Sequence, residues 1–148
     1  MQQRGFSIVE LMIVVGIIGV IATFGLPLYS DYMTRSKVSE PLTLLSGLRQ
    51  PMAEYHLTWN TWPTIASIGG KTTGLYTSVI ESGGPINFDY KGSSQESFYV
   101  EATMKPENAN IGGKQIRLVY VLESRDWVCT LEGTSDPIPE QYLPASCR

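Results

Sequence analysis

The stretch from Leu11 to Leu28 carries no charged residue and constrains the fold more than any other part of the chain. Thirteen of its 18 residues are apolar. As an α-helix it would be about 27 Å long, close to the hydrocarbon thickness of a bilayer. Extending it back to Phe6 gives 23 residues, enough to span a membrane, but adds the carboxylate of Glu10. The sequence therefore predicts a membrane-length helix with one acidic residue near its start.

Three common kinds of apolar segment could account for this stretch, and each meets a different difficulty. A buried core helix of a soluble domain would have to be covered on all its faces, which a chain of 148 residues can hardly do. A secretory signal peptide would place Glu10 inside its apolar region, and no Ala-x-Ala cleavage site follows Ala22. A simple one-pass anchor needs only length and hydropathy, and it leaves Glu10 unexplained.

Glu10 needs a partner, because a carboxylate in hydrocarbon costs roughly 2.5 to 3.5 kcal/mol on insertion scales. The basic residue nearest to it is Arg4. A cut between Gly5 and Phe6 would create a new α-amino group, with a reference pKa of about 8, four residues before Glu10. Such a cut would therefore supply the cation that Glu10 lacks.

The residues around this site resemble the processing site and N-terminal helix of the type IVa pilins. The resemblance extends to about Tyr32 and rests on the apolar run and on Gly5, Phe6, Ser7, Ile8, Val9 and Glu10. It implies a leader peptide, 1–5, that a prepilin peptidase at the inner membrane removes after Gly5. It also implies N-methylation of Phe6 and a role for Glu10 in the docking of subunits.

Features inside the apolar run also bear on assembly. Small residues recur every three positions, which either lets helices approach closely in a membrane or is a chance pattern in a membrane helix: Gly16, Gly19, Ala22 and Gly25. Pro27 removes a helical hydrogen bond, so we expect it to kink or loosen the helix near Thr23. By resemblance, the helix between Gly19 and Pro27 melts in the assembled filament and becomes an extensible joint.

Beyond the first helical segment, 6–28, apolar residues follow steps of three and four, which predicts an amphipathic half of the helix over 29–55. Charged residues such as Glu40 occupy its other faces, and the predicted inner face consists of Val38, Leu42, Leu45, Leu48, Met52 and Tyr55. Pro41 and Pro51 interrupt the pattern, so either the helix kinks twice or Ser39 caps a fresh start with Pro41 in its first turn.

The remaining residues, 56–148, are expected to form a globular head. From about His56 to Pro85 the chain is rich in Gly, Thr, Ser and Pro, which predicts a long ordered loop. Trp59 and Trp62 are expected to seal this loop against the core. Four half-buried antiparallel strands are predicted at 86–90, 97–104, 115–122 and 127–131, with a turn at 110–114. The fold class is therefore α+β, a long N-terminal helix packed on a four-stranded antiparallel sheet.

The chain has two cysteines, Cys129 and Cys147, and no C-x-x-C motif. We expect them to form a structural disulfide, which would contribute about 3 kcal/mol in the chain-entropy model and indicates an oxidising compartment. By resemblance, the C-terminal loop 129–147 is the D-region of the pilins, which is exposed on the filament and serves in adhesion or antibody recognition.

Catalysis, metal binding and nucleic-acid binding find little support in the sequence. His56 is the sole histidine, and no nucleophile or phosphate-binding motif surrounds it, so no enzyme activity, cofactor or metal is expected. The chain has 11 Lys and Arg against 14 Asp and Glu, so nucleic acid is not the expected partner. Lys114, Arg117 and Arg125 would still form a local basic patch.

The resemblance implies a structural subunit, the major one, whose precursor lies in the inner membrane with its head in the periplasm. The subunit then polymerises with other copies into an extracellular filament, and its partners are the prepilin peptidase and methyltransferase and an ATP-driven assembly machinery. Adhesion, twitching motility and DNA uptake are the roles it leaves open. Three alternatives remain: a pseudopilin of type II secretion, which the expected disulfide disfavours; a minor or competence pilin that binds DNA; and an anchored binding domain that never polymerises.

Overall fold

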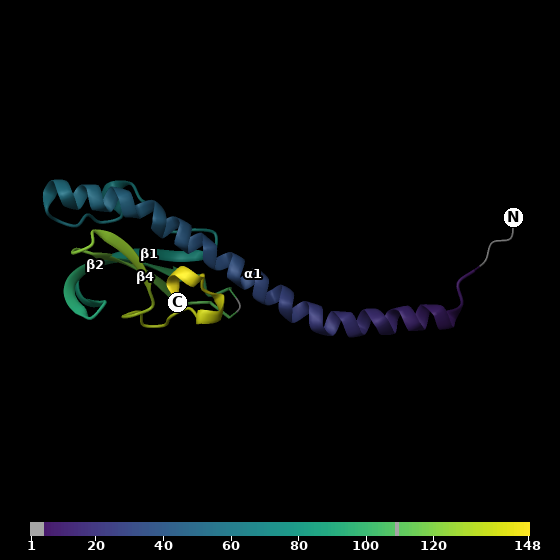
Figure 1. The fold of residues 1–148 in the computed structure, drawn as a ribbon. Coiled ribbons are helices and arrows are strands. Elements are labelled where there is room, and N and C mark those ends of the chain that lie inside the picture. The colour runs from purple at the N-terminus through teal and green to yellow at the C-terminus, as the bar shows by residue number, and fades with distance from the viewer. Residues whose placement is uncertain (1–4, 109) are drawn as a thin grey trace. The chain divides into compact units, whose positions relative to one another are not determined.

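The computed structural model of the chain describes residues 5–108 and 110–148. These residues form one long helix, four strands and three short 3-10 helices, which Figure 1 shows in chain order. The elements are α1 (Ile8–Trp59), η1 (Ala66–Ile68), β1 (Thr77–Tyr90), β2 (Ser93–Met104), β3 (Gln115–Val121), β4 (Asp126–Thr130), η2 (Glu140–Tyr142) and η3 (Ala145–Cys147). The chain divides into two units, Met1–Met33 and Thr34–Arg148. Of the predicted leader, residues 1–4 lie outside the described part.

The first unit contains the apolar part of α1. Every residue from Gly5 to Tyr32 is exposed. An 18-residue window of α1 has a mean hydropathy of 2.5, and none of it is buried. By length and composition α1 can therefore cross a membrane. The apolar run is not the core helix of this chain's own domain, so that alternative is wrong.

α1 continues through its prolines, Pro27, Pro41 and Pro51. Ser39 does not cap a second helix, because its hydroxyl donates to the carbonyl of Ser36 at 2.6 Å within α1. Of the two alternatives for the prolines, the fresh start at Ser39 is therefore wrong. The helix also runs past residue 55, to Trp59. It stops there because Asn60, at a left-handed φ of 52°, donates its N–H to the carbonyl of His56 at 2.8 Å.

The second unit, which we call the head, packs the later part of α1 on a sheet with the order β1-β2-β3-β4. All three strand pairs are antiparallel, so the predicted α+β class is confirmed. The core between helix and sheet includes Val38, Leu45, Leu48, Met52, Ile80, Phe98, Val100, Ala102, Met104, Ile116 and Leu118. The predicted inner face of α1 thus supplies its share of the core, although Leu42 and Tyr55 are only half-buried.

The first strand is longer than predicted. β1 begins at Thr77, so the loop expected over 56–85 is wrong for residues 77–85. Gly83 and Gly84, which suggested a loop, lie within β1 at a shift of register. The ring of Tyr99 on β2 lies against Gly83, where a Cβ would come within 2.6 Å of the tyrosine hydroxyl. The glycine therefore makes room for a cross-strand aromatic side chain.

The central strand β3 is buried on both faces, whereas the sequence predicted half-buried strands. Residues 116–121 are all buried. Val119 and Val121 form a second cluster with Phe88 of β1, on the face of the sheet that does not join the α1 core. Ile86, Tyr90, Tyr99 and Val128 border this cluster.

Candidate assembly sites

Ser7 and Glu10 form a capping box at the start of α1. Glu10 Oε2 accepts the N–H of Ser7 at 2.9 Å, and Ser7 Oγ accepts the N–H of Val9 at 3.3 Å. Reciprocal hydrogen bonds of this kind satisfy backbone groups that a helix start leaves without partners. The sequence reasoning missed this box, although Ser-x-x-Glu before an apolar run is its signature.

The capping box gives the carboxylate of Glu10 a partner in its own chain. The hydrogen bond occupies one of the two carboxylate oxygens, so the group can still accept from another donor. It is made to the amide of Ser7, and a cut between Gly5 and Phe6 would leave that amide intact. Glu10 can therefore cap its own helix and accept a hydrogen bond from a second donor at the same time.

The glycines of the apolar run have no packing role within the chain. A Cβ at Gly16, Gly19 or Gly25 would meet nothing within 4 Å. Glycine in a helix interior is roughly 0.8 to 1.0 kcal/mol less favourable than alanine, so helix formation does not explain these residues either. Small residues of this kind allow close approach of another helix in a membrane, and a chance occurrence in an apolar helix would look the same in the single chain.

The stretch from Gly19 to Pro27 departs from the regular helical ladder at two points. Thr23 Oγ1 donates to the carbonyl of Gly19 at 2.9 Å, four residues back. Pro27 has no N–H to give to the carbonyl of Thr23. Both features weaken the local ladder, although α1 remains helical here in the single chain.

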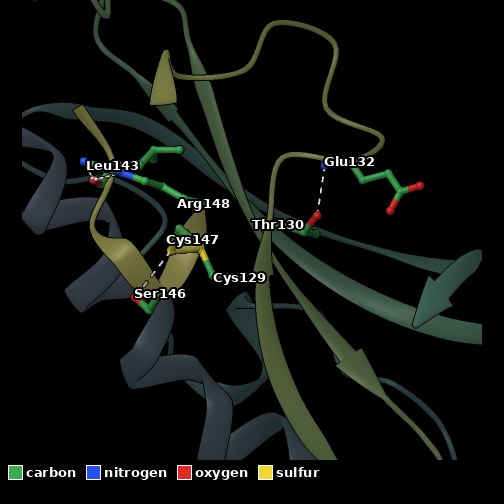
Figure 2. The surroundings of a disulfide bond; sticks show 7 residues. All are labelled: Cys129, Thr130, Glu132, Leu143, Ser146, Cys147 and Arg148. Carbon is green, nitrogen blue, oxygen red and sulfur yellow. Dashed lines mark hydrogen bonds between the residues drawn. A yellow bond between two sulfur atoms is a disulfide. The ribbon is translucent and has the colours of Figure 1, made fainter. Parts of the chain in front are cut away.

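The predicted disulfide is confirmed. Cys129 of β4 and Cys147 of η3 are bonded, with their Cα atoms 4.8 Å apart (Figure 2). Figure 2 also shows Arg148 turned back toward Leu143, whose carbonyl accepts from Nε at 3.1 Å and from Nη2 at 3.0 Å. The disulfide and this side chain fix the end of the loop 129–147.

Gln115, which the sequence reasoning did not single out, holds the middle of the loop 129–147. Its main chain exchanges hydrogen bonds with Asp136 and Ile138, at 2.7 and 3.0 Å. Its side-chain Oε1 accepts the N–H groups of Ser135 and Asp136, at 3.0 and 3.2 Å. Ile138 and Leu143 are buried, so parts of this loop belong to the core of the head.

The basic patch expected from Lys114, Arg117 and Arg125 does not form, because two of these residues are paired with carboxylates. Lys114 forms an ion pair with Asp136. Arg117 Nη2 lies 2.8 Å from Glu101 Oε2, and both side chains are only 9% exposed. The guanidinium also stacks 4.0 Å from the ring centroid of Tyr99. These pairings remove the charge feature that favoured nucleic acid.

Glu40 fastens the segment that follows α1 to the helix. Its carboxylate accepts the N–H groups of Leu75 and Tyr76, the latter at 2.6 Å, and the hydroxyl of Thr77 at 3.3 Å. The sequence reasoning treated Glu40 as one of the surface charges of an amphipathic helix. Its partners lie some 35 residues further along the chain, beyond the reach of a periodicity argument.

Only one of the two predicted tryptophan plugs seals the head. Trp62 stacks between His56 and Phe98, with ring centroids 4.1 and 4.3 Å away. Trp59 is 67% exposed, so the prediction is wrong for this residue. His56, predicted to lie in the loop, is in the last turn of α1 and serves in this stack.

Each of the two units of the chain matches a family of known proteins. Residues 34–148 match the family described as pilin (bacterial filament), and residues 1–26 match the prokaryotic N-terminal methylation motif. The first match covers the whole head and most of the chain, so this chain belongs to the pilin family.

Three relatives match this chain along almost their whole length. The chain is 34% identical to the fimbrial protein EcpC of Eikenella corrodens, over 99% of this chain and 91% of the relative. It is 31% identical to the type IV major pilin protein PilE of Neisseria gonorrhoeae, over 99% and 94%. It is 29% identical to the type IV major fimbrial protein FimA of Dichelobacter nodosus, over 99% and 96%.

Proposed function

We propose that this chain is the major structural subunit of a type IV pilus and that it works by assembly. The observation that carries the proposal is the exposed apolar unit: a window of mean hydropathy 2.5 with none of its residues buried. Such a surface is stable only in a bilayer or against other apolar surfaces. The relatives named as type IV major pilins support the same function.

The proposed precursor is divided into a leader, 1–5, a filament-core helix, 6–28, an amphipathic helix half, 29–55, and a globular part, 56–148. The globular part and residues 34–55 together make up the head defined above. A prepilin peptidase cuts between Gly5 and Phe6 and methylates the new N-terminus of Phe6. The match of residues 1–26 to the N-terminal methylation motif supports this step. Before assembly the subunit is held in the inner membrane by 6–28, with its head in the periplasm.

Assembly exchanges the bilayer for the helices of neighbouring copies. Glu10 of one copy accepts the amine of Phe6 from another, while it keeps its own helix capped. Gly19 lets the backbones approach closely, and the weakened ladder between Gly19 and Pro27 gives way as the filament forms. Apolar burial changes little in this transfer, so the work of moving the subunit falls to a separate assembly machinery.

The extracellular filament would serve adhesion, twitching motility or DNA uptake. The loop 129–147 belongs to the head and would lie on the filament surface. The disulfide supports a pilin over a pseudopilin, and it is suited to an oxidising space outside the cytoplasm.

Intact mass tests the proposal. The protein sheared from the cell surface is compared with the protein of the membrane fraction, without reduction. We expect a surface species that lacks residues 1–5, carries one methyl group and is two hydrogens short. If the cut and methylated form stayed in the membrane, a pseudopilin or a minor pilin would be indicated. An intact leader there would favour the anchored binding domain.

A further inference from the structure

A polar pocket of about 350 Å³ lies in the head between α1 and the start of β4, and we call it the Arg125 pocket. Its charged lining residues are Arg49, Arg125 and Asp126. Asp126 already has partners, because its Oδ1 accepts from Arg49 Nη2 at 3.1 Å and from the N–H of Trp127 at 2.7 Å. Arg125 is exposed, and no carboxylate of the described residues pairs with it. The pocket therefore has one positive charge in excess and is suited to a carboxylate.

The side of α1 that borders the Arg125 pocket also borders the C-terminal loop of the head. A second groove is lined by Arg35, Val38, Ser39 and Leu42 of α1 and by loop residues that include Tyr142 and Leu143. The α1 residues of the Arg125 pocket are Ser46, Arg49, Gln50 and Ala53, each of which follows one of these four by 11 residues. Eleven residues make about three helical turns, a rise of about 16 Å. The groove at the loop and the Arg125 pocket thus lie on the same side of α1.

Glu140 is a carboxylate that the loop presents close to this second groove. It begins η2, two residues before Tyr142, which is buried and lines the groove. The side chain of Glu140 is exposed, and within the described residues it forms no hydrogen bond or ion pair. The disulfide on one side and the hydrogen bonds of Gln115 on the other hold the loop around it. Glu140 is therefore an unpaired charge on an ordered segment.

We propose that Glu140 of one copy enters the Arg125 pocket of another copy in the filament. The proposal rests on the proposed function, because it needs other copies of this chain. A copy displaced along α1 by three turns carries its Glu140 to the level of the pocket. The pocket and Glu140 are different parts of the surface, so the contact is heterologous, and repetition of such a contact generates an open helical filament. The head thereby adds an ionic contact to assembly, and the copy that supplies Glu140 need not be the one that contacts Glu10.

Zero-length cross-linking of filaments sheared from cells tests this contact. Arg125→Lys places an amine in the pocket, and a carbodiimide joins an amine to a carboxylate that lies beside it. We expect a ladder of oligomers on a denaturing gel, and a peptide from the dimer band in which position 125 is joined to Glu140. Glu140→Gln in the same background should remove this peptide. Glu132→Gln is the matched control, because Glu132 is another exposed carboxylate of the loop 129–147, and it should keep the peptide.

Exchange of the two charges gives a second readout. Arg125→Glu and Glu140→Arg should each lower the yield of sheared filament about fivefold, the effect of an exposed ion pair at the upper end of its range. The double variant restores opposite charges at the contact and should recover most of the wild-type yield. Both residues are exposed, so the urea midpoint of the single chain should stay close to that of the wild type in all three variants.

Several outcomes would overturn the inference. Filaments of Arg125→Lys that lack the joined peptide would do so, as would a double variant whose yield is no higher than that of the single variants. The joined peptide in the monomer band would mean that Glu140 reaches the pocket of its own chain, and dimers without a ladder would mean a closed contact. A wild-type chain that gives no filament at all would instead contradict the proposed function.

Discussion

The two units of this chain differ in where their side chains find partners. In the head, α1 and the sheet bury each other's apolar residues, and buried charges such as Glu101 and Arg117 are paired within the chain. In the described part of the first unit, large apolar side chains such as Phe6, Ile8 and Phe24 are 84%, 77% and 69% exposed. The head is therefore a fold complete in itself, whereas the first unit has a sequence suited to a bilayer or to other copies.

This comparison makes a general prediction about variants. Substitutions in the head should change the stability of a single chain. Substitutions in the first unit should leave that stability nearly unchanged and act on assembly. The predictions below test this division in order of their expected effect on single-chain stability, measured by urea unfolding of the full chain in detergent micelles.

The largest effect is expected for Arg117→Ala. It would leave Glu101 as an uncompensated buried charge, which costs about 3 to 5 kcal/mol. The urea concentration at the midpoint of unfolding should fall accordingly, and the proposed cut after Gly5 should be unaffected. Lys71→Ala removes an exposed positive charge and should stay within about 0.5 kcal/mol. Equal stability of the two variants would mean that the pair contributes nothing.

Loss of the disulfide should have the second-largest effect on the stability of the single chain. The double variant Cys129→Ser, Cys147→Ser is expected to lose about 3 kcal/mol, because an open chain gains conformational freedom when it unfolds. The hydrogen bonds of Gln115 to Asp136 and Ile138 should still hold the middle of the loop. Wild type unfolded under reducing conditions is the control and should match the double variant. A midpoint that does not move in either sample would contradict the importance of the bond.

A smaller loss is expected for Glu40→Ala. The substitution leaves the part-buried amide of Tyr76 without its charged acceptor, a hydrogen bond that contributes about 1.5 to 3 kcal/mol, whereas the exposed amide of Leu75 can bond to water instead. Hydrogen exchange at these two amides should accelerate along with the loss of stability. The Glu54 side chain accepts from Gln50 on the exposed surface of α1, so Glu54→Ala is the matched control and should cost a few tenths of a kcal/mol.

Some of the contacts behind these predictions could be predicted from the sequence, and others could not. The apolar run and the class of the sheet could be predicted because each is recorded in a local pattern, and the cysteine pairing because two cysteines allow only one. The start of β1 could not, since Gly83 and Gly84 suggest a loop until Tyr99 is known to pack there. Glu40 and Gln115 were missed because their partners are 20 residues or more away. The capping box of Ser7 and Glu10 could have been found from the sequence.

Glu10→Gln should have the smallest effect on the single chain and a large effect on the filament. Glutamine can accept the Ser7 amide as glutamate does, so the capping box and the helix start should survive. The negative charge that would receive the amine of another copy is lost. We therefore expect unchanged helix content in micelles and a strong reduction of the filament sheared from cells.

Ser7→Ala is the reverse test, because it weakens the cap by about 1 kcal/mol and keeps the charge. If Ser7→Ala abolished the filament and Glu10→Gln did not, Glu10 would act as a helix cap alone. Filament formation would then depend on a hydrogen bond within the first unit, contrary to the division between the two units drawn above.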